Sequence, residues 1–283
     1  MKERPIPHEI IQPTENLDVR FRLFEDTGSF VSSHWHNSLE IIYITSGSLH
    51  VKIGSQTFDL HEDDCILINS SVVHATHCID GNTSIMLQVP SPFLKRYMPD
   101  YDSCFFDLAI HSKDGSYQVR LAQLKKILKD MEAIEILKPE AGSLHFNSLL
   151  FELLFLLYHH FRIPGESLQQ PLVSSSLTML EPVLEYTNLH YSRPIAIQEV
   201  ADIAHLQPQY FCRKFKLFMG QTYLEYLNEI RLSHIYADLL NKDTPLYEIL
   251  ENHGFTNYKL FRKIFREKFG CTPGEIRSRR EKT

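Results

Sequence analysis

Hydrophobic and polar residues alternate in short runs through the first third of the chain. In the run that begins at Val19, apolar side chains recur at Phe21 and Leu23, with Arg20 and Arg22 on the opposite face. Five further runs, several of them separated by glycines, cover residues 39–45, 48–53, 56–60, 65–68 and 84–89. Many short strands at this spacing are typical of a β-sandwich or β-barrel. The pattern therefore predicts an N-terminal barrel.

The hydrophobic period then changes to that of a helix. Residues 117–137 carry one apolar stripe, formed by Leu121, Leu124, Leu128 and Met131. Residues 143–161 are apolar on nearly every side, which predicts a buried helix. The segment 164–176 is rich in proline, glycine and serine, a composition typical of a linker between domains. A further amphipathic helix is predicted at 177–191.

The last third contains a degenerate internal repeat. The motif Phe-x3-Phe-x4-Gly begins at Phe211 and again at Phe261, an offset of 50 residues, and a short apolar helix precedes each copy. A short helix, a tight turn and an amphipathic helix form a helix-turn-helix pattern, here expected at about 197–219 and 245–269. Residues 222–240 lie between the copies and read as one helix. Its length of about 28 Å approaches the spacing of about 34 Å between neighbouring major-groove faces of B-DNA.

Charge is distributed unevenly along the 283 residues, a length that allows two domains with cores of their own. The net charge is −6, but 15 basic and 13 acidic residues lie from Ser174 onward, against 14 and 22 before it. Residues 259–282 hold nine basic and three acidic residues. The positive charge therefore collects on the second motif and the tail, as expected for binding a polyanion.

The cysteines and the chain start bear on location. Five scattered cysteines without a C-x-x-C pair predict free thiols in a reducing cytoplasm. Residues 1–8 are polar and lack a signal-peptide core, and the longest apolar run, 149–158, is too short to span a membrane. No Ser/His/Asp arrangement or phosphate-binding loop indicates catalysis. We expect a cytoplasmic protein that is not an enzyme and does not bind a membrane.

Specific motifs occur in roughly the last hundred residues. They are Tyr226-Leu227-Asn228-x-Ile230-Arg231-Leu232, Gly254-Phe255, Phe261-Arg262-Lys263-x-Phe265, Gly270-x-Thr272-Pro273 and Arg277. Together they resemble the AraC/XylS family of bacterial transcription regulators. Three positions depart from the family pattern, namely Ile235 and Leu250, where alanine is usual, and Ile276, where tyrosine is usual. These departures concern packing.

The resemblance implies that the second helix of each motif contacts DNA. Base contacts would come from Gln209, Cys212 and Arg213 in the first motif, and from Lys259, Arg262 and Lys263 in the second. Arginine can bind guanine bidentately and glutamine can bind adenine, whereas Lys216 is expected on a phosphate. The strongly basic second helix predicts a steep salt dependence. The predicted DNA-binding residues are Gln209, Cys212, Arg213, Lys216, Tyr258, Lys259, Arg262, Lys263 and Arg266.

The segment 28–47 has the spacing Gly-x5-His-x-His-x3-Glu-x6-Gly. This spacing resembles the first motif of the cupin barrels, and His74 falls at the histidine of their second motif, although residues 61–64 replace its usual turn. The region also resembles the sensing domain of AraC-type regulators, where a jelly roll holds an effector, often a sugar. The predicted fold class is α+β, with a cupin-like barrel domain at 1–163, a linker at 164–176 and a DNA-binding domain at 177–283.

Polar residues of the barrel are the candidate effector site. In a strand, His34 and His36 point to one face, and Glu40 shares it if the chain stays extended. With His74 they could bind an effector, ligate a divalent metal or form only a structural polar pair. The favoured interpretation is an effector pocket without metal or cofactor, and Trp35 or Tyr43 could stack on a sugar. The candidate residues are Arg20, Arg22, His34, His36, Glu40, Tyr43 and His74.

The family resemblance also implies partners. It suggests that the stripe of Leu121, Leu124, Leu128 and Met131 forms an antiparallel homodimer contact; the alternative is that it packs on its own barrel. It implies a sequence-specific regulator, an activator of a carbohydrate-utilisation operon, that binds double-stranded DNA, RNA polymerase and a small effector, most simply a sugar. The competing hypotheses are a metal-dependent cupin enzyme or metal sensor with a DNA-binding domain, and a DNA-binding protein with a vestigial barrel.

Overall fold

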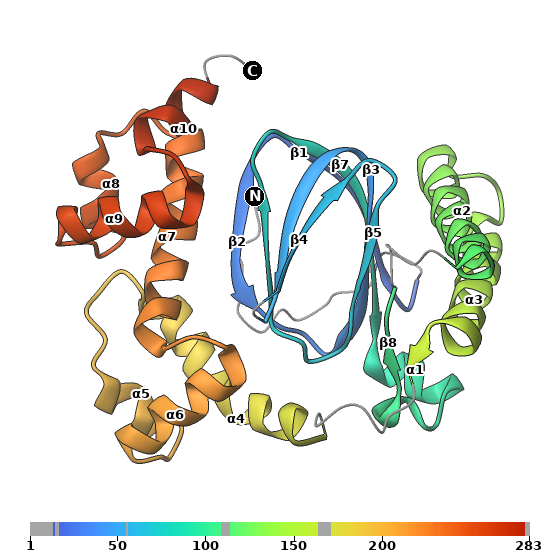
Figure 1. Cartoon of the computed structure of the whole chain (residues 1–283), viewed down its shortest axis with the longest axis horizontal. Helices are drawn as coiled ribbons and strands as arrows, with labels where there is room; N and C mark the ends of the chain where they lie inside the picture. The colour runs from blue at the N-terminus through green and yellow to red at the C-terminus, as the bar shows by residue number, and fades with distance from the viewer. Residues whose placement is uncertain (1–13, 15–16, 55, 109–113, 164–170, 281–283) are drawn as a thin grey trace.

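The computed structural model describes residue 14 and residues 17–54, 56–108, 114–163 and 171–280. A curled β-sheet lies in the middle, with two long helices on one side and a separate group of helices on the other (Figure 1). The predicted linker residues 164–170 and the polar chain start lie outside the described residues. The predicted α+β fold, with an N-terminal cupin-like half-barrel and a C-terminal helical domain, is confirmed.

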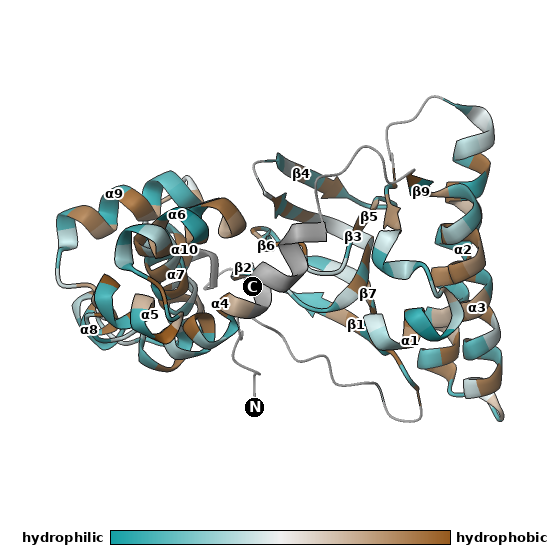
Figure 2. Cartoon of the chain, turned by 90° about the horizontal axis from the view of Figure 1, so that it is seen from below, coloured by the Kyte–Doolittle hydropathy of each residue, from teal (hydrophilic) through white to brown (hydrophobic). Residues whose placement is uncertain are grey.

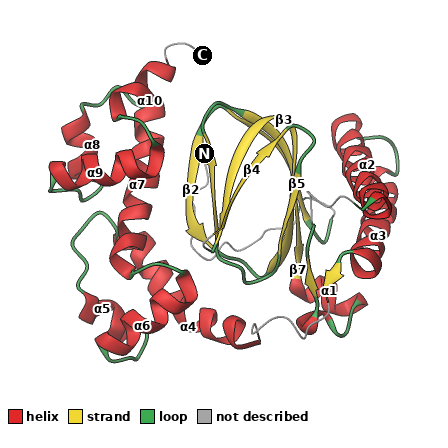
Figure 3. Cartoon of the chain, in the orientation of Figure 1, coloured by secondary structure: helices red, strands yellow, loops and turns green. Residues whose placement is uncertain are grey.

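Seven strands form the curled sheet, and all their pairings are antiparallel (Figure 3). Their order is β1-β7-β3-β6-β2, with β4 and β5 each paired to β3. The strands are β1 (Arg20–Asp26), β2 (Ser29–His34), β3 (Ser38–Ile53), β4 (Gln56–His61), β5 (Cys65–Ile68), β6 (His74–Cys78) and β7 (Asn82–Pro90). The sequence pattern did not predict β2 and β6 as strands, although they carry His34 and His74.

Strand β3 runs through 16 residues and joins the two halves of the sheet. Its first half pairs with β5 and its second half with β4 and β6. The sequence pattern predicts two strands, 39–45 and 48–53, with a break at Gly47. This break is wrong, because the register against β7 shifts just before Gly47 and the strand continues. Gly47 has a φ of +79°, and a Cβ atom there would lie 2.3 Å from the carbonyl oxygen of Gly81. Only glycine fits this close approach.

Helices α2 (Gly115–Leu137) and α3 (Gly142–His160) cover the outer face of the half-barrel (Figure 2). At one edge lie α1 (Ser91–Tyr97), a 3-10 turn at Tyr101–Ser103, and a small sheet of β8 (Phe105–Phe106) and β9 (Arg162–Ile163). Residues of β3 alternate between two cores. Leu39 and Ile41 pack with the helices, whereas Ile42 and Ile44 belong to the core inside the barrel.

The predicted dimer stripe on α2 requires a correction. Its four residues are fully buried in the chain's own core, between the sheet and α3: Leu121, Leu124, Leu128 and Met131. The alternative, that the stripe packs on its own barrel, is the correct one. The prediction that the second helix is buried all round is also wrong, because Leu144, Phe151 and Phe155 of α3 are exposed. An exposed apolar stripe therefore lies on α3.

The helical domain contains the predicted helices with small shifts, together with a C-terminal helix, α10, that the sequence pattern did not predict. They are α4 (Pro171–His190), α5 (Ile197–Ile203), α6 (Pro208–Met219), α7 (Tyr223–Asn241), α8 (Leu246–Asn252), α9 (Tyr258–Phe269) and α10 (Pro273–Arg280). Helix α4 begins earlier than predicted, so residues 171–176 are helical. Helix α7 starts with a reciprocal capping box between Thr222 and Glu225, which fixes its first turn.

The barrel and the helical domain meet where β2 lies along α7 (Figure 1). The hydroxyl of Ser233 donates to the carbonyl oxygen of Phe30 over 2.8 Å, and the amide of Ser33 donates to Glu229 over 3.2 Å. The single tryptophan, Trp35, is fully buried in the apolar cluster of the helical domain. The two domains therefore share a packed interface.

Candidate functional site

Helices α6 and α9 each bury one aromatic face and expose a polar one. Phe211 and Phe215 of α6, like Phe261 and Phe265 of α9, are fully buried in the domain's two cores. Every residue predicted to bind DNA is exposed: Gln209, Cys212, Arg213, Lys216, Tyr258, Lys259, Arg262, Lys263 and Arg266. The barrel packs on α7 and leaves these faces open, so both helices present their predicted reading surfaces to solvent.

Helix α7 holds the two reading helices at fixed places along one rod. The rings of Phe215 and Tyr226 lie 5.4 Å apart, which joins α6 to the first half of α7. The rings of Phe269 and Tyr236 lie 4.8 Å apart, which joins α9 to the second half. With 19 residues, α7 spans about 28 Å. This length suits two contacts on neighbouring turns of one DNA face.

Aromatic residues near the start of each reading helix support its arginines. The guanidinium of Arg213 lies 5.9 Å from the ring centre of Tyr210, and that of Arg262 lies 5.9 Å from the ring centre of Tyr258. Such cation–π contacts restrict the side chain while leaving its N–H donors exposed. Gln209, Cys212 and Arg213 also line a shallow hollow with Ile197 of α5. The geometry is compatible with an edge of a base entering between these side chains.

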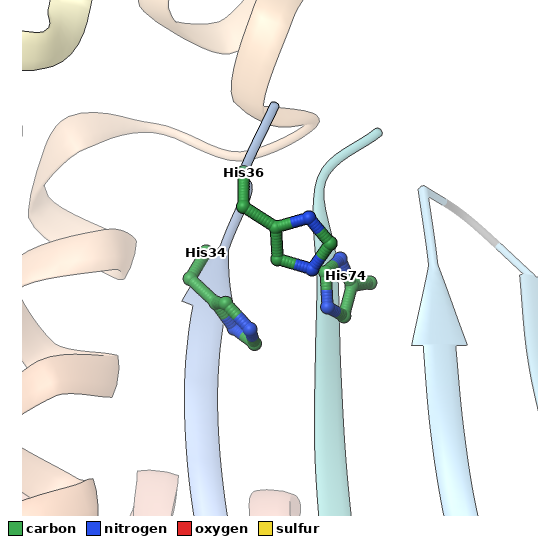
Figure 4. A group of neighbouring side chains, drawn as sticks. All are labelled: His34, His36 and His74. Carbon is green, nitrogen blue, oxygen red and sulfur yellow. The ribbon is translucent and has the colours of Figure 1, made fainter. Parts of the chain in front are cut away.

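Three histidines converge between β2 and β6 inside the barrel (Figure 4). The ring centres of His34 and His74 lie 4.2 Å apart, and those of His36 and His74 lie 5.1 Å apart. One ring nitrogen from each residue lies within 4.8 Å of the other two. All three side chains are buried. The three histidines that the sequence offered as candidates therefore lie together, which the sequence alone did not decide.

Backbone carbonyl groups orient all three rings. In each histidine, Nδ1 lies 2.9 to 3.1 Å from the carbonyl oxygen of a residue two positions away. A carbonyl oxygen can only accept, so Nδ1 donates its proton in each ring, and the lone pair of a neutral His34 or His74 ring lies on Nε2. Nε2 of His36 instead faces the carboxylate of Glu40. Nε2 of His74 has no hydrogen-bond partner among the described residues. This is the orientation in which imidazoles bind metal ions.

A chain of buried polar groups continues from His36 across the barrel. Oε2 of Glu40 lies 2.7 Å from Nε2 of His36 and accepts a hydrogen bond of 2.7 Å from Gln88. Arg20 donates to Gln88 over 3.3 Å. The sequence analysis did not include Gln88 among the candidate residues, although a polar residue within the apolar run 84–89 indicates a buried polar group. Together these groups offer donors and acceptors to a polar ligand.

Burial and neighbouring charges set the protonation of this cluster. Burial alone would raise the pKa of Glu40, but the hydrogen bond and charge of His36, with His74 and Gln88, hold it well below its usual range. Burial lowers the pKa of His74 to about 4, against an opposing effect of Glu40. Near neutral pH the cluster therefore combines an ionised carboxylate with a neutral His74 imidazole.

The remaining effector candidates lie elsewhere. Arg22 shares the strand face of Arg20 but is exposed. Tyr43 requires a correction, because its ring packs on the outer face of the sheet and its hydroxyl donates to Asp63 over 2.7 Å. Lys129 of α2 lies 5.3 Å from the centre of that ring. Trp35 also points away from the interior, so neither predicted stacking aromatic can reach a sugar inside the barrel.

A half-barrel with a buried polar cluster, joined to a domain with two exposed reading helices, defines a transcription regulator that binds DNA and a ligand. Two family models match the chain, an AraC-like ligand binding domain over residues 16–154 and a helix-turn-helix domain over residues 200–279. The chain belongs to the AraC/XylS family of transcription regulators, as its C-terminal motifs predicted. Within the described residues, no helix is long and apolar enough to cross a membrane.

Relatives named as transcription regulators align with most of the chain. The regulator YdeC of Bacillus subtilis (strain 168) is 23% identical over 264 residues, which cover 88% of this chain and 87% of that protein. The HTH-type transcriptional activator RhaS of Enterobacter sp. (strain 638) is 25% identical over 259 residues, 88% of each chain. The DNA-binding domain of AdpA, solved in complex with a target DNA, is 23% identical, with a TM-score of 0.33, and covers 35% of this chain and 89% of its own.

Proposed function

We propose that the protein reads two neighbouring major-groove segments of one DNA face through α6 and α9, and that an effector in the barrel controls this binding. The observation that carries the proposal is the pair of exposed polar helix faces fixed along the single rod α7. In this proposal the cell compartment is the cytoplasm. The names of the relatives support a binding protein rather than an enzyme.

The two reading helices divide the work between base recognition and phosphate binding. Helix α6 offers Gln209 and Arg213, side chains that can form bidentate hydrogen bonds with adenine and guanine. Helix α9 offers Lys259, Arg262 and Lys263, a denser positive surface that favours phosphate contacts and counterion release. We therefore assign most of the sequence preference to α6 and most of the salt dependence to α9.

The effector part of the proposal keeps two candidates. A carbohydrate that controls activation of a carbohydrate-utilisation operon follows from the family resemblance, and the buried groups of Arg20, Gln88 and Glu40 could hydrogen-bond its hydroxyls. Neither Trp35 nor Tyr43 lies in the interior, so neither offers a stacking surface to a sugar ring there. The converging histidines favour a metal ion as the second candidate. Contact with RNA polymerase is part of the activator proposal.

A homodimer through α3 replaces the predicted contact through α2. Leu144, Phe151 and Phe155 follow one another along the exposed side of α3, and Phe155 keeps 60% of its surface exposed. Phe151 and Phe155, with Tyr97 and Tyr158, border a hollow of about 330 Å³ beside the helix. An apolar stripe of this kind on a helix can pair with its own copy in an antiparallel, self-complementary contact. A second copy of this chain is the partner that we propose.

Selection of duplexes from a randomised pool with the full-length protein tests the proposed function. We expect a bipartite site with two half-sites about one helical turn apart. Fluorescence anisotropy on the selected duplex then compares the wild type with Arg213→Ala and with Lys263→Ala. Loss of discrimination at one base position in Arg213→Ala alone supports the division of work between helices. Selection of no preferred sequence, or equal loss on every duplex in both variants, contradicts it.

A further inference from the structure

We infer that His34, His36 and His74 bind one divalent transition-metal ion through their Nε2 atoms, and that this ion is the effector. The inference rests on the proposed function, because it assumes that occupancy of the barrel controls DNA binding. The ligand class differs from the carbohydrate that the family resemblance suggests. Four features carry it: the orientation of the rings, the chemistry of the ligand set, the neighbouring carboxylate, and the position of the site against the helical domain.

The rings are already set for an ion. Two nitrogens bound tetrahedrally at about 2.1 Å from one ion lie about 3.4 Å apart, and one ring nitrogen of each histidine already lies within 4.8 Å of those of the other two. Hydrogen bonds from Nδ1 to backbone carbonyls hold each ring in place, as partners outside the ligand shell do in metal sites. Only small rotations of the side chains are needed to close the site.

His74 supplies the observation that a purely structural cluster does not explain. The residue keeps only 1% of its surface exposed, yet its Nε2 has no hydrogen-bond partner among the residues that the structure describes. An unpaired polar atom in a buried site destabilises the folded protein, because it has lost its hydrogen bonds to water. A bound ion removes that penalty by accepting the Nε2 lone pair. The His74 ring lies beside both other rings (Figure 4), at 4.2 Å from the ring centre of His34 and 5.1 Å from that of His36.

The ligand set favours a particular group of metals. Imidazole nitrogens prefer Zn²⁺, Ni²⁺, Cu²⁺ and Fe²⁺, whereas Mg²⁺ and Ca²⁺ prefer oxygen ligands. Three imidazoles leave at least one open position on such an ion. Glu40 places a carboxylate oxygen 2.7 Å from Nε2 of His36 and so supplies negative charge beside the ion. Any proton that His36 shares with Glu40 at Nε2 is released to solvent when the ion binds.

The segments that contain the three histidines also contact the helical domain. Trp35, between His34 and His36, points the opposite way into the apolar cluster of α4, α6 and α7. On β6, His77 faces away from His74, and its ring lies 5.3 Å from that of Phe269 in α9. His34 and His74 are register partners next to an irregularity in β2.

An ion that draws β2 and β6 together therefore acts on both faces of these strands. The histidines on the inner face are its ligands, and the side chains on the outer face pack against α7 and the end of α9. If the docked and undocked arrangements bind the ion with different affinity, the ion shifts the balance between them by that difference. DNA affinity then depends on metal because the docked arrangement fixes α6 and α9 relative to the barrel.

Metal titration of the full-length, untagged protein, stripped with a chelator, tests the inference. We expect one Zn²⁺ per chain, a raised unfolding midpoint and a change in Trp35 fluorescence, which closed-shell Zn²⁺ does not quench directly. Co²⁺ should give a visible absorption band, because its partly filled d shell reports nitrogen ligands. Mg²⁺ should give none of these effects. His74→Ala should weaken Zn²⁺ binding by about 100-fold or more, whereas His61→Ala, an exposed histidine of the same barrel, should not.

The same samples separate this inference from the proposed function. His74→Ala is chosen because it removes no hydrogen bond at Nε2. If His74→Ala does not fold, Glu40→Gln replaces it, because this variant keeps the shape of the site and should lower Zn²⁺ affinity. Affinity for the selected duplex is measured with Zn²⁺ and with chelator, and a shift of tenfold or more in wild type, absent in His74→Ala, supports the inference. Unchanged DNA affinity with tight Zn²⁺ binding overturns the effector role. No Zn²⁺ binding with normal DNA binding overturns the metal site and leaves the proposed function standing.

Discussion

Glu229 is a charged group buried where α7, α9 and β2 meet, and removing its partner Lys268 should have a measurable cost. The carboxylate accepts hydrogen bonds from Gln221 over 2.8 Å, from the Ser33 amide over 3.2 Å, and from the Lys268 ammonium. Burial alone would raise the pKa of Glu229, but Lys268, Gln221 and Ser33 hold it below its usual range. Lys268→Ala leaves this charge with two neutral donors.

The expected loss follows from burial. Removing one partner of a fully buried ion pair costs about 3–5 kcal/mol. The side chain of Lys268 keeps 28% exposure, and two hydrogen bonds remain on Glu229, so we expect a loss of about 2–3 kcal/mol in the free energy of unfolding. Lys263→Ala is the matched control on the same helix. Lys263 is 71% exposed and lies 3.9 Å from Glu267, so its removal should cost below about 0.5 kcal/mol.

Urea unfolding followed through Trp35 measures this loss, since the only tryptophan lies at the domain contact. A double-mutant cycle with Glu229→Gln isolates the contribution of the charge. In the Glu229→Gln background, Lys268→Ala should cost below about 1 kcal/mol in the free energy of unfolding, because only the contact of Lys268 with the ring of Phe30 is then lost. An equal cost in both backgrounds would refute the argument from charge. A cost for Lys263→Ala as large as that for Lys268→Ala would refute the argument from burial.

The pair also predicts a pH dependence. In the wild type the pKa of Glu229 is depressed, so its contribution is complete above the ordinary value of 4.5 and is lost as pH falls through the folded-state pKa. In Lys268→Ala the remaining burial raises the pKa of Glu229, so the variant is destabilised at neutral pH and recovers as pH falls toward 4.5. The difference between the two proteins should therefore shrink on acidification. A constant difference would contradict this account.

Three further outcomes are expected. Arg213→Ala should cost about 1–3 kcal/mol on the selected duplex and relax one base position, measured by anisotropy on single-base variants; equal losses on all duplexes would exclude base reading. Lys263→Ala should reduce the slope of log affinity against log salt by about 0.9, and an unchanged slope would exclude a phosphate contact. Phe151→Glu with Phe155→Glu should give a folded monomer in sedimentation, whereas Leu124→Glu should unfold the protein; a persistent dimer of the first variant would exclude α3 as the contact.

The reading helices could be predicted from the sequence because their pattern is local. Phenylalanines four residues apart bury one side of a helix, and the polar residues between them must then face solvent. Pro208 and Gly220 mark the start and end of α6 in the sequence, and both act so in the structure. Nothing outside the helix is needed to decide which residues are exposed.

The partners of an apolar stripe could not be predicted in the same way. Periodicity shows that Leu124 and Leu128 share a face, but the energy of burying them is the same against a second chain or against the sheet of their own chain. Tyr43 shows the corresponding limit for a strand, because one position along β3 separates the outer core from the interior. Both decisions depend on tertiary contacts that a single sequence does not record.

The alternation along His34, Trp35 and His36 carries the most consequence for function. Successive side chains of an extended chain must point to opposite faces, so a strand with ligands on one face cannot respond to them without moving the residue between them. Trp35 fills the apolar cluster of the helical domain, and a close-packed interior transmits such a displacement rather than absorbing it. If the histidines bind the proposed ion, the metal site and the domain contact are two faces of one extended segment, and we expect a change at one of them to displace the other.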